Sequence, residues 1–141
     1  MTTEGPRLSD TDCAYLAGMI DQSGWIRVRR SGRGSKASRP LVLYIGKLNS
    51  EQAKWIRDRL GDRVTLEMGT PRWRADFVTP NDSAVVLALV SPFLLTFKEK
   101  AKLMFRYART SCSPGGRLTP EQISERASIE ADLALLRKRG A

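Results

Sequence analysis

The chain has 141 residues, with 24 lysine and arginine residues, 15 aspartate and glutamate residues and no histidine. The length favours one domain with a core of its own, and the lack of histidine excludes histidine-bound zinc sites and histidine-based acid–base catalysis. The formal net charge of +9 favours a polyanionic partner.

The N-terminal residues are polar and lack the apolar stretch of a secretory signal, and no later window reaches the roughly 18 apolar residues of a membrane span. We therefore expect a cytoplasmic protein with no membrane partner. Ser9 can cap a first helix with Asp12 as its reciprocal partner, and helical spacing continues to about Asp21. Residues 1–8 are accordingly expected to form a flexible tail before a single domain at 9–141.

Two strands with a basic loop between them follow this helix. Residues 24–30 alternate apolar and polar side chains, which predicts a half-buried strand with an arginine face. Residues 31–40 form the loop, and residues 41–49 form a second strand. Its outward Val42 and Tyr44 either touch thymine methyl groups or pack as ordinary strand residues.

The segment from Gln22 to Ser50 contains no aspartate or glutamate. A solvated basic surface would explain its charge, but its hairpin pattern favours nucleic-acid binding. Its basic residues are Arg27, Arg29, Arg30, Arg33, Lys36, Arg39 and Lys47.

A second helix and a second hairpin come next. A short amphipathic helix starts at Ser50 and ends at Gly61. Strands at 64–68 and 72–78 are separated by a Gly-Thr-Pro turn, and arginine and aspartate side chains point outward from the second of them. The side chains expected to face the core are Val64, Leu66, Met68, Trp73, Ala75 and Phe77.

Helices complete the chain. One starts at Thr79-Pro, a longer one is expected at about 93–110 after the interruption at Pro92, and the last runs from Pro120 to about Arg139. The order αββαββα with additional C-terminal helices predicts an α+β fold whose antiparallel sheet exposes one arginine-rich face. Such a face fits the major groove of DNA, where arginine can bind guanine O6 and N7.

The first helix ends in LAGMIDQSG (16–24), and three further stretches accompany this motif. They are NSEQAKWI (49–56), SPFLLTFKEKAKL (91–103) and LALLRKRG (133–140). Over about residues 12–140 the chain resembles the single-motif LAGLIDADG homing endonuclease family. The resemblance implies the αββαββα fold of that family, and a homodimer that sets two sheets along a pseudo-palindromic site in double-stranded DNA.

A stripe of small residues on the first helix would let two helix backbones approach closely. Such a stripe also suits an ordinary core helix, whereas the resemblance implies a contact between subunits. The residues expected at this dimer interface are Ala14, Ala17, Gly18 and Asp21.

The motif departs from the family at its eighth position, where the resemblance implies a metal-binding acid and this chain has Ser23. A neutral hydroxyl is a poor ligand for Mg²⁺, which prefers carboxylate oxygens. The resemblance also implies a basic residue at the position of Phe97, one residue before Lys98, and a water-positioning polar residue at Asn49, which is retained. Asp21 offers a substitute carboxylate, although a structural role for it is favoured. We therefore expect no catalytic residues, no metal and no cofactor.

The predicted function is sequence-specific binding of double-stranded DNA by a homodimer that has lost nuclease activity, used as a transcriptional regulator or repressor. Asp76 is expected either to accept a hydrogen bond from cytosine N4 or to steady Arg74. The expected base contacts are Arg27, Arg29, Tyr44, Arg72, Arg74 and Asp76. Phosphate contacts, which position a protein without specifying sequence, are expected from Arg30, Arg33, Lys36, Arg39 and Lys47.

Three alternatives stay open from the sequence. The first is an active endonuclease that holds Mg²⁺ in an atypical way. The second is an RNA-binding, maturase-like splicing factor, although the narrow major groove of A-form RNA suits a β-ribbon poorly. The third is the inactive half of a heterodimer. A nucleoid-associated protein or a phage-encoded protein in a bacterial host would fit the expected location.

Overall fold

The computed structural model describes residues 7–28, 41–69, 72–110 and 118–138. The four strands form one antiparallel sheet in the order β1-β2-β4-β3. This arrangement confirms the α+β fold with the order αββαββα and additional C-terminal helices. The elements are α1 (Asp10–Ser23), β1 (Gly24–Val28), β2 (Leu41–Leu48), α2 (Ser50–Leu60), η2 (Gly61–Arg63), β3 (Val64–Met68), β4 (Trp73–Phe77), α3 (Pro80–Val90), η3 (Ser91–Phe93), α4 (Lys98–Ala108) and α5 (Pro120–Lys138).

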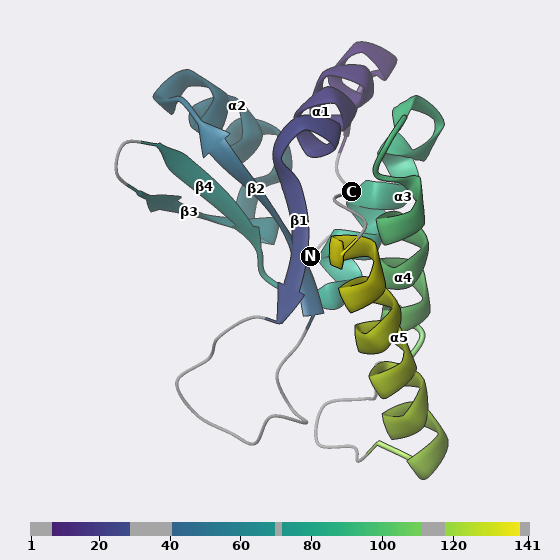
Figure 1. Ribbon diagram of the computed structural model, residues 1–141. Coiled ribbons are helices and arrows are strands. Elements are labelled where there is room, and N and C mark those ends of the chain that lie inside the picture. The colour runs from purple at the N-terminus through teal and green to yellow at the C-terminus, as the bar shows by residue number, and fades with distance from the viewer. Residues whose placement is uncertain (1–6, 29–40, 70–71, 111–117, 139–141) are drawn as a thin grey trace.

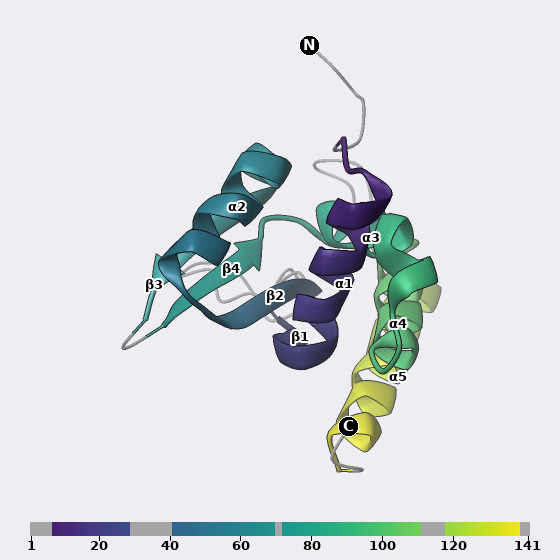
Figure 2. The same ribbon diagram turned by 90° about the horizontal axis from the view of Figure 1, so that it is seen from above.

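The helices lie on one side of the sheet and along its β1 edge. Figure 1 shows α3, α4 and α5 running side by side next to β1, with α2 near β3 and β4. Figure 2 shows α1 between the sheet and α3, and α1 contacts β1, β2 and α3. In the described part of the chain, the opposite face of the sheet has no helix packed over it.

Local hydrogen bonds set the ends of the helices. The capping box predicted for α1 is present, with Asp12 N donating to Ser9 Oγ at 3.0 Å and Ser9 N donating to Asp12 Oδ2 at 3.2 Å. The helix continues to Ser23, slightly beyond the expected end. Gly61 ends α2 in the left-handed region with φ 58°, as glycine allows. Leu8, which the sequence placed in the tail, packs against the core.

The helix expected at about 93–110 begins only at Lys98. Asp21, near the end of α1, accepts hydrogen bonds from three consecutive backbone amides: Leu95 at 2.8 Å, Thr96 at 3.0 Å and Phe97 at 2.9 Å. The carboxylate holds these residues in a bend before α4, so they do not continue as helix from η3. Asp21 therefore has a structural role that joins the end of α1 to the start of α4.

The exposure of Met68 contradicts the expectation from the sequence, and the burial of Val42 favours one of its two alternatives. Met68 was expected in the core, but its side chain is 72% exposed because it ends the edge strand β3. Val42 shares the open face with Tyr44 and with Arg27, its cross-strand partner, as expected, but it is 2% exposed. This burial fits the alternative in which Val42 packs as an ordinary strand residue. No helix in the described part of the chain combines the length and the apolar character needed to cross a membrane.

Candidate nucleic-acid interface

The strands place apolar and polar side chains on opposite faces of the sheet, as their alternation predicts. Ile26, Ile45 and Phe77 are fully buried on the side of the helices. On the open face, consecutive cross-strand pairs form a row across the sheet: Trp25–Tyr44–Asp76–Thr65.

Two arginines and two acids form a connected cluster on this face. The guanidinium carbons of Arg27 and Arg74 lie 4.6 and 5.6 Å from the centre of the Tyr44 ring. Asp76 Oδ1 lies 3.0 Å from Arg74 Nε and 4.0 Å from Arg27 Nη2. Arg74 also donates a hydrogen bond to Glu67 across the β3–β4 pair. We call these five side chains the arginine cluster.

The arginine cluster is partly withdrawn from solvent, with 31% of the Arg74 side chain and 19% of the Asp76 side chain exposed. Burial lowers the pKa of Arg74, but Asp76 and Glu67 outweigh it and raise the pKa above its ordinary value. Although Arg74 Nε and Asp76 Oδ1 lie within ion-pair distance, neither atom makes a well-directed hydrogen bond. The Asp76 and Glu67 carboxylates and the Tyr44 ring hold the Arg74 guanidinium on this face, and the Tyr44 ring holds that of Arg27.

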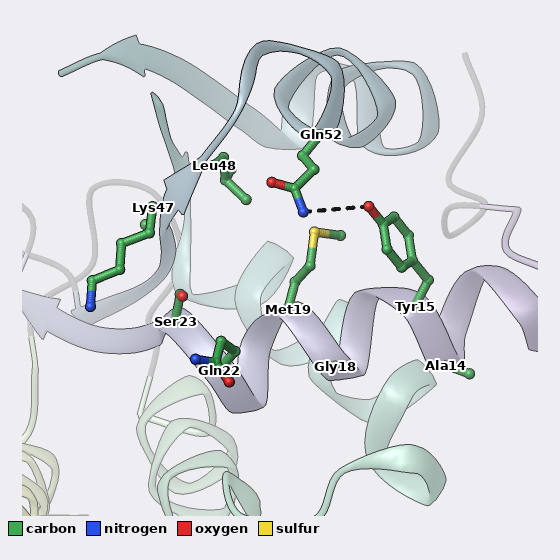
Figure 3. Close-up of a pocket in the computed structure, with 10 residues that line it drawn as sticks. Ala14, Tyr15, Gly18, Met19, Gln22, Ser23, Lys47, Leu48 and Gln52 are labelled. Atoms are coloured by element: carbon green, nitrogen blue, oxygen red, sulfur yellow. Dashed lines mark hydrogen bonds between the residues drawn. The ribbon is translucent and has the colours of Figure 1, made fainter. Parts of the chain in front are cut away.

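A hollow of about 370 Å³ lies between α1 and the β2–α2 junction. Figure 3 shows Tyr15 and Gln52 at one part of it, joined by a 3.5 Å hydrogen bond, and Lys47 beside Ser23 at another. The residues that line it are Ala14, Tyr15, Gly18, Met19, Gln22, Ser23, Gly46, Lys47, Leu48 and Gln52.

The side chains that line this hollow do not fit a divalent metal ion. They offer hydroxyl, amide, ammonium and thioether groups but no carboxylate, whereas Mg²⁺ prefers carboxylate and water oxygens. The positive charge of Lys47 opposes a cation further. No group of three or more metal-ligating acids or cysteines occurs among the described residues.

Solved structures with the same architecture are homing endonucleases. I-CvuI in complex with its target superposes with a TM-score of 0.73 at 19% identity, covering 90% of this chain and 82% of that chain. The archaeal intron-encoded I-Vdi141I, complexed with DNA, gives 0.67 at 20% identity, covering 89% of this chain and 83% of that chain. The LAGLIDADG enzyme I-SmaMI, bound to cleaved DNA, gives 0.58 at 17% identity, covering 89% of this chain and 44% of that chain. The chain has the LAGLIDADG homing endonuclease fold. No protein-family model matches the sequence, and no curated protein matches it.

Within the LAGLIDADG fold, the three positions at which a catalytic group was considered mainly contact other parts of the protein. Ser23 ends α1 and lines the hollow. Phe97 is 2% exposed and packs in the core, while the neighbouring Lys98 is exposed at the start of α4. Asn49 caps α2, where its Oδ1 accepts a hydrogen bond from Gln52 N at 2.8 Å.

The small-residue stripe of the LAGLIDADG helix divides between the surface and the core. Ala14 and Gly18 are exposed and lie one turn apart beside Tyr15, which is 45% exposed. Ala17, in contrast, is fully buried in this chain, and the carboxylate of Asp21 bonds to the segment before α4. Ala17 and Asp21 are therefore not part of the exposed stripe.

The expected base and phosphate contacts are only partly described. Arg27, Tyr44, Arg74 and Asp76 come together in the arginine cluster, while Arg72 is exposed just before β4. Lys47 is exposed at an irregularity of the β2–β4 pairing, with a positive φ of 57° that is unusual for a lysine. Arg29, Arg30, Arg33, Lys36 and Arg39 lie outside the described residues.

The structure also brings together charged residues that no sequence motif pointed to. Glu67 binds Arg74, and Lys100 of α4 and Arg137 of α5 both face the Trp25 ring. The Glu67–Arg74 pair could have been found from the hairpin register. No spacing in the sequence links Trp25 to Lys100 and Arg137, because the packing of α4 and α5 on the β1 edge creates this group.

Proposed function

We propose that the protein is a sequence-specific, double-stranded DNA-binding homodimer that keeps the LAGLIDADG fold without its nuclease activity. The arginine cluster on the open sheet face is the observation that carries this proposal. A two-stranded ribbon fits the major groove, and arginine binds the O6 and N7 edge of guanine in bidentate fashion. Binding of a specific site without cleavage suits a transcriptional regulator, with a cytoplasmic or nucleoid location.

The contacts within the arginine cluster support base reading over general attraction to phosphate. Tyr44 and Asp76 restrict the two guanidinium groups before any ligand binds. Side chains that are already ordered lose less conformational entropy on binding. Because Asp76 is close to both arginines, steadying them is a better role for it than a direct contact with cytosine.

The loss of cleavage is supported by the chemistry of the hollow beside Ser23. A hydrolytic metal site in a protein needs ligands that hold the ion and orient its water. The hollow contains a hydroxyl and an ammonium group where a carboxylate would be required. The protein should therefore bind its site without Mg²⁺, and at least as tightly in a chelator, because Mg²⁺ competes for the DNA phosphates.

Selection from a randomised duplex library in Mg²⁺, with mapping of all DNA ends, tests this function. We expect enriched pseudo-palindromic duplexes that remain intact with the wild type. Ser23→Asp restores a carboxylate at the motif position, so cleavage gained only by this variant would support the proposal. Defined breaks made by the wild type would overturn the claim of lost activity, and no enrichment of duplex DNA would overturn the claim of DNA recognition.

The proposed dimer contact is supported by the surroundings of Gly18. A Cβ atom added at Gly18 would meet nothing within 4 Å. Glycine inside a helix costs about 0.5–1 kcal/mol relative to alanine, and the described contacts within one chain give no reason for it. Close approach of a second α1 helix, as in an isologous interface, would supply that reason.

Gly18→Leu is expected to convert the dimer to a folded monomer, because the added side chain would hold the two helices apart. Light scattering coupled to gel filtration measures the change in mass, and far-UV circular dichroism checks that the helices remain. Ala127→Leu is the control, since Ala127 is exposed on α5 away from the stripe. A Gly18→Leu variant that stays dimeric would contradict a contact through this helix.

A further inference from the structure

Two positively charged side chains from different helices face the same tryptophan at the β1 edge of the sheet. Lys100 Nζ of α4 lies 4.8 Å from the centre of the Trp25 ring, and the guanidinium carbon of Arg137 of α5 lies 4.9 Å from it. Lys100 Nζ also lies 5.5 Å from the centre of the Phe97 ring. Trp25 begins the row across the open sheet face, so this pair adjoins the arginine cluster.

Neither charge is neutralised within the described part of the chain. The Lys100 ammonium group makes no hydrogen bond or ion pair there, and the Arg137 guanidinium donates a 3.3 Å hydrogen bond to the neutral carbonyl of Ile26. Burial and the nearby Arg137 both lower the pKa of Lys100. Keeping two like charges together without an acid is unfavourable, and a bound anion would relieve this repulsion.

The two side chains of the site differ in burial, since Lys100 is buried and Arg137 is exposed on α5. Lys100 is only 8% exposed, and its Nζ lies close to the Trp25 and Phe97 rings. Its ammonium nitrogen is nevertheless not among the fully enclosed polar atoms of the described residues, so the charged end reaches solvent. An anion held here would require little further loss of side-chain freedom at Lys100.

We propose that Lys100 and Arg137 together bind one backbone phosphate of the DNA duplex at the β1 edge. This inference rests on the proposed function, because a duplex lying along the row from Trp25 to Thr65 brings a phosphate strand to that edge. Phosphate contacts position a protein on DNA, while base contacts specify the sequence. The β1-edge site therefore sets the register in which the arginine cluster meets the bases.

The salt dependence of binding tests the β1-edge site. Lys100→Met keeps the buried stem and Arg137→Gln keeps a polar planar group, and each removes one charge. The slope of log affinity against log salt becomes smaller in magnitude by about 1 for every phosphate contact that is lost. Because a homodimer has two such sites, each variant is expected to reduce the magnitude of the slope by about 2. The double variant should lose little more than either single variant, because both side chains hold the same phosphate.

Lys102→Met is the matched control, because Lys102 is also on α4 but is exposed and paired with Glu99 at 3.3 Å. Arg137→Lys should retain most of the wild-type salt slope, which separates loss of charge from loss of packing. If Lys100→Met and Arg137→Gln change the slope no more than Lys102→Met while the wild type binds duplex, the site is refuted and the proposed function stands.

A titration with inorganic phosphate separates the two proposals further. The ¹³Cε signal of Lys100 is expected to shift during this titration, while that of Lys102 stays in place. A shift at Lys100 in a protein that fails to bind duplex DNA would support the anion site and refute the proposed function. Equal responses at Lys100 and Lys102 would count against a site built for phosphate.

Discussion

Asp21→Ala is expected to lower the free energy of unfolding by about 2–4 kcal/mol. The Asp21 carboxylate accepts hydrogen bonds from three backbone amides and from the Thr96 hydroxyl at 3.2 Å. Hydrogen bonds to a charged group contribute about 1.5–3 kcal/mol each, but solvent can replace part of this loss at the more exposed amides. Urea unfolding at several protein concentrations measures the effect and separates it from any change in dimerisation, which would make the midpoint depend on concentration.

The control for this variant is Asp58→Ala. Asp58 is an exposed acid on α2 that forms no ion pair in the described part of the chain. Its removal should change stability by no more than about 0.5 kcal/mol. Equal stability losses in the two variants would contradict the role assigned to Asp21, and loss of DNA binding without loss of stability would instead place Asp21 at the ligand.

Asp76→Asn is expected to reduce the discrimination for guanine at one position of each half-site by about 1–3 kcal/mol, or roughly 5- to 150-fold. The amide keeps the shape of the carboxylate but loses the charge that holds Arg27 and Arg74. Affinity for unrelated duplexes should stay unchanged or rise, because the variant protein carries one negative charge fewer in each subunit. Competition assays on the selected site and on duplexes with a substituted base pair measure this ratio.

Glu67→Gln provides a control with the same change in charge. Its side chain is 61% exposed and contacts Arg74 but not Arg27, so we expect a smaller loss of discrimination. Arg74→Gln should abolish the preference at the same base pair as Asp76→Asn. If Asp76→Asn and Glu67→Gln relax specificity equally, or if neither changes it, Asp76 does not position the arginines for base reading.

Short-range patterns were sufficient to predict most of the elements. Period-two alternation identified β1, β3 and β4, and a run of apolar residues identified β2. The capping residues Ser9 and Thr79 marked the helix starts that the structure shows. These signals work because a cap or a strand face depends on residues only a few positions apart. Met68 shows the limit of strand alternation. Alternation predicts which face a side chain points to, but it does not show where the core ends, and Met68 lies beyond that end.

The candidate site was predicted less completely, for reasons that depend on contacts between distant segments. The strand pattern placed Arg27, Arg74 and Asp76 on one face, but only the strand order brings β1 and β4 to either side of Tyr44. The shorter α4 could not be predicted because Asp21, more than 70 positions earlier, holds the residues before it. The burial of Lys100 depends on Trp25 in the same way.

The sequence by itself determined the order of the elements, the arginine-rich strand faces and the presence of Ser23 in place of an acid. These properties follow from residue identity and local spacing. Only the tertiary structure decided that Ala17 and Gly18 face opposite environments, that Asp76 lies between two arginines, and that Lys100 and Arg137 meet at Trp25. The physical reason is that burial and electrostatic pairing depend on neighbours that folding brings together, and local spacing carries no information about those neighbours.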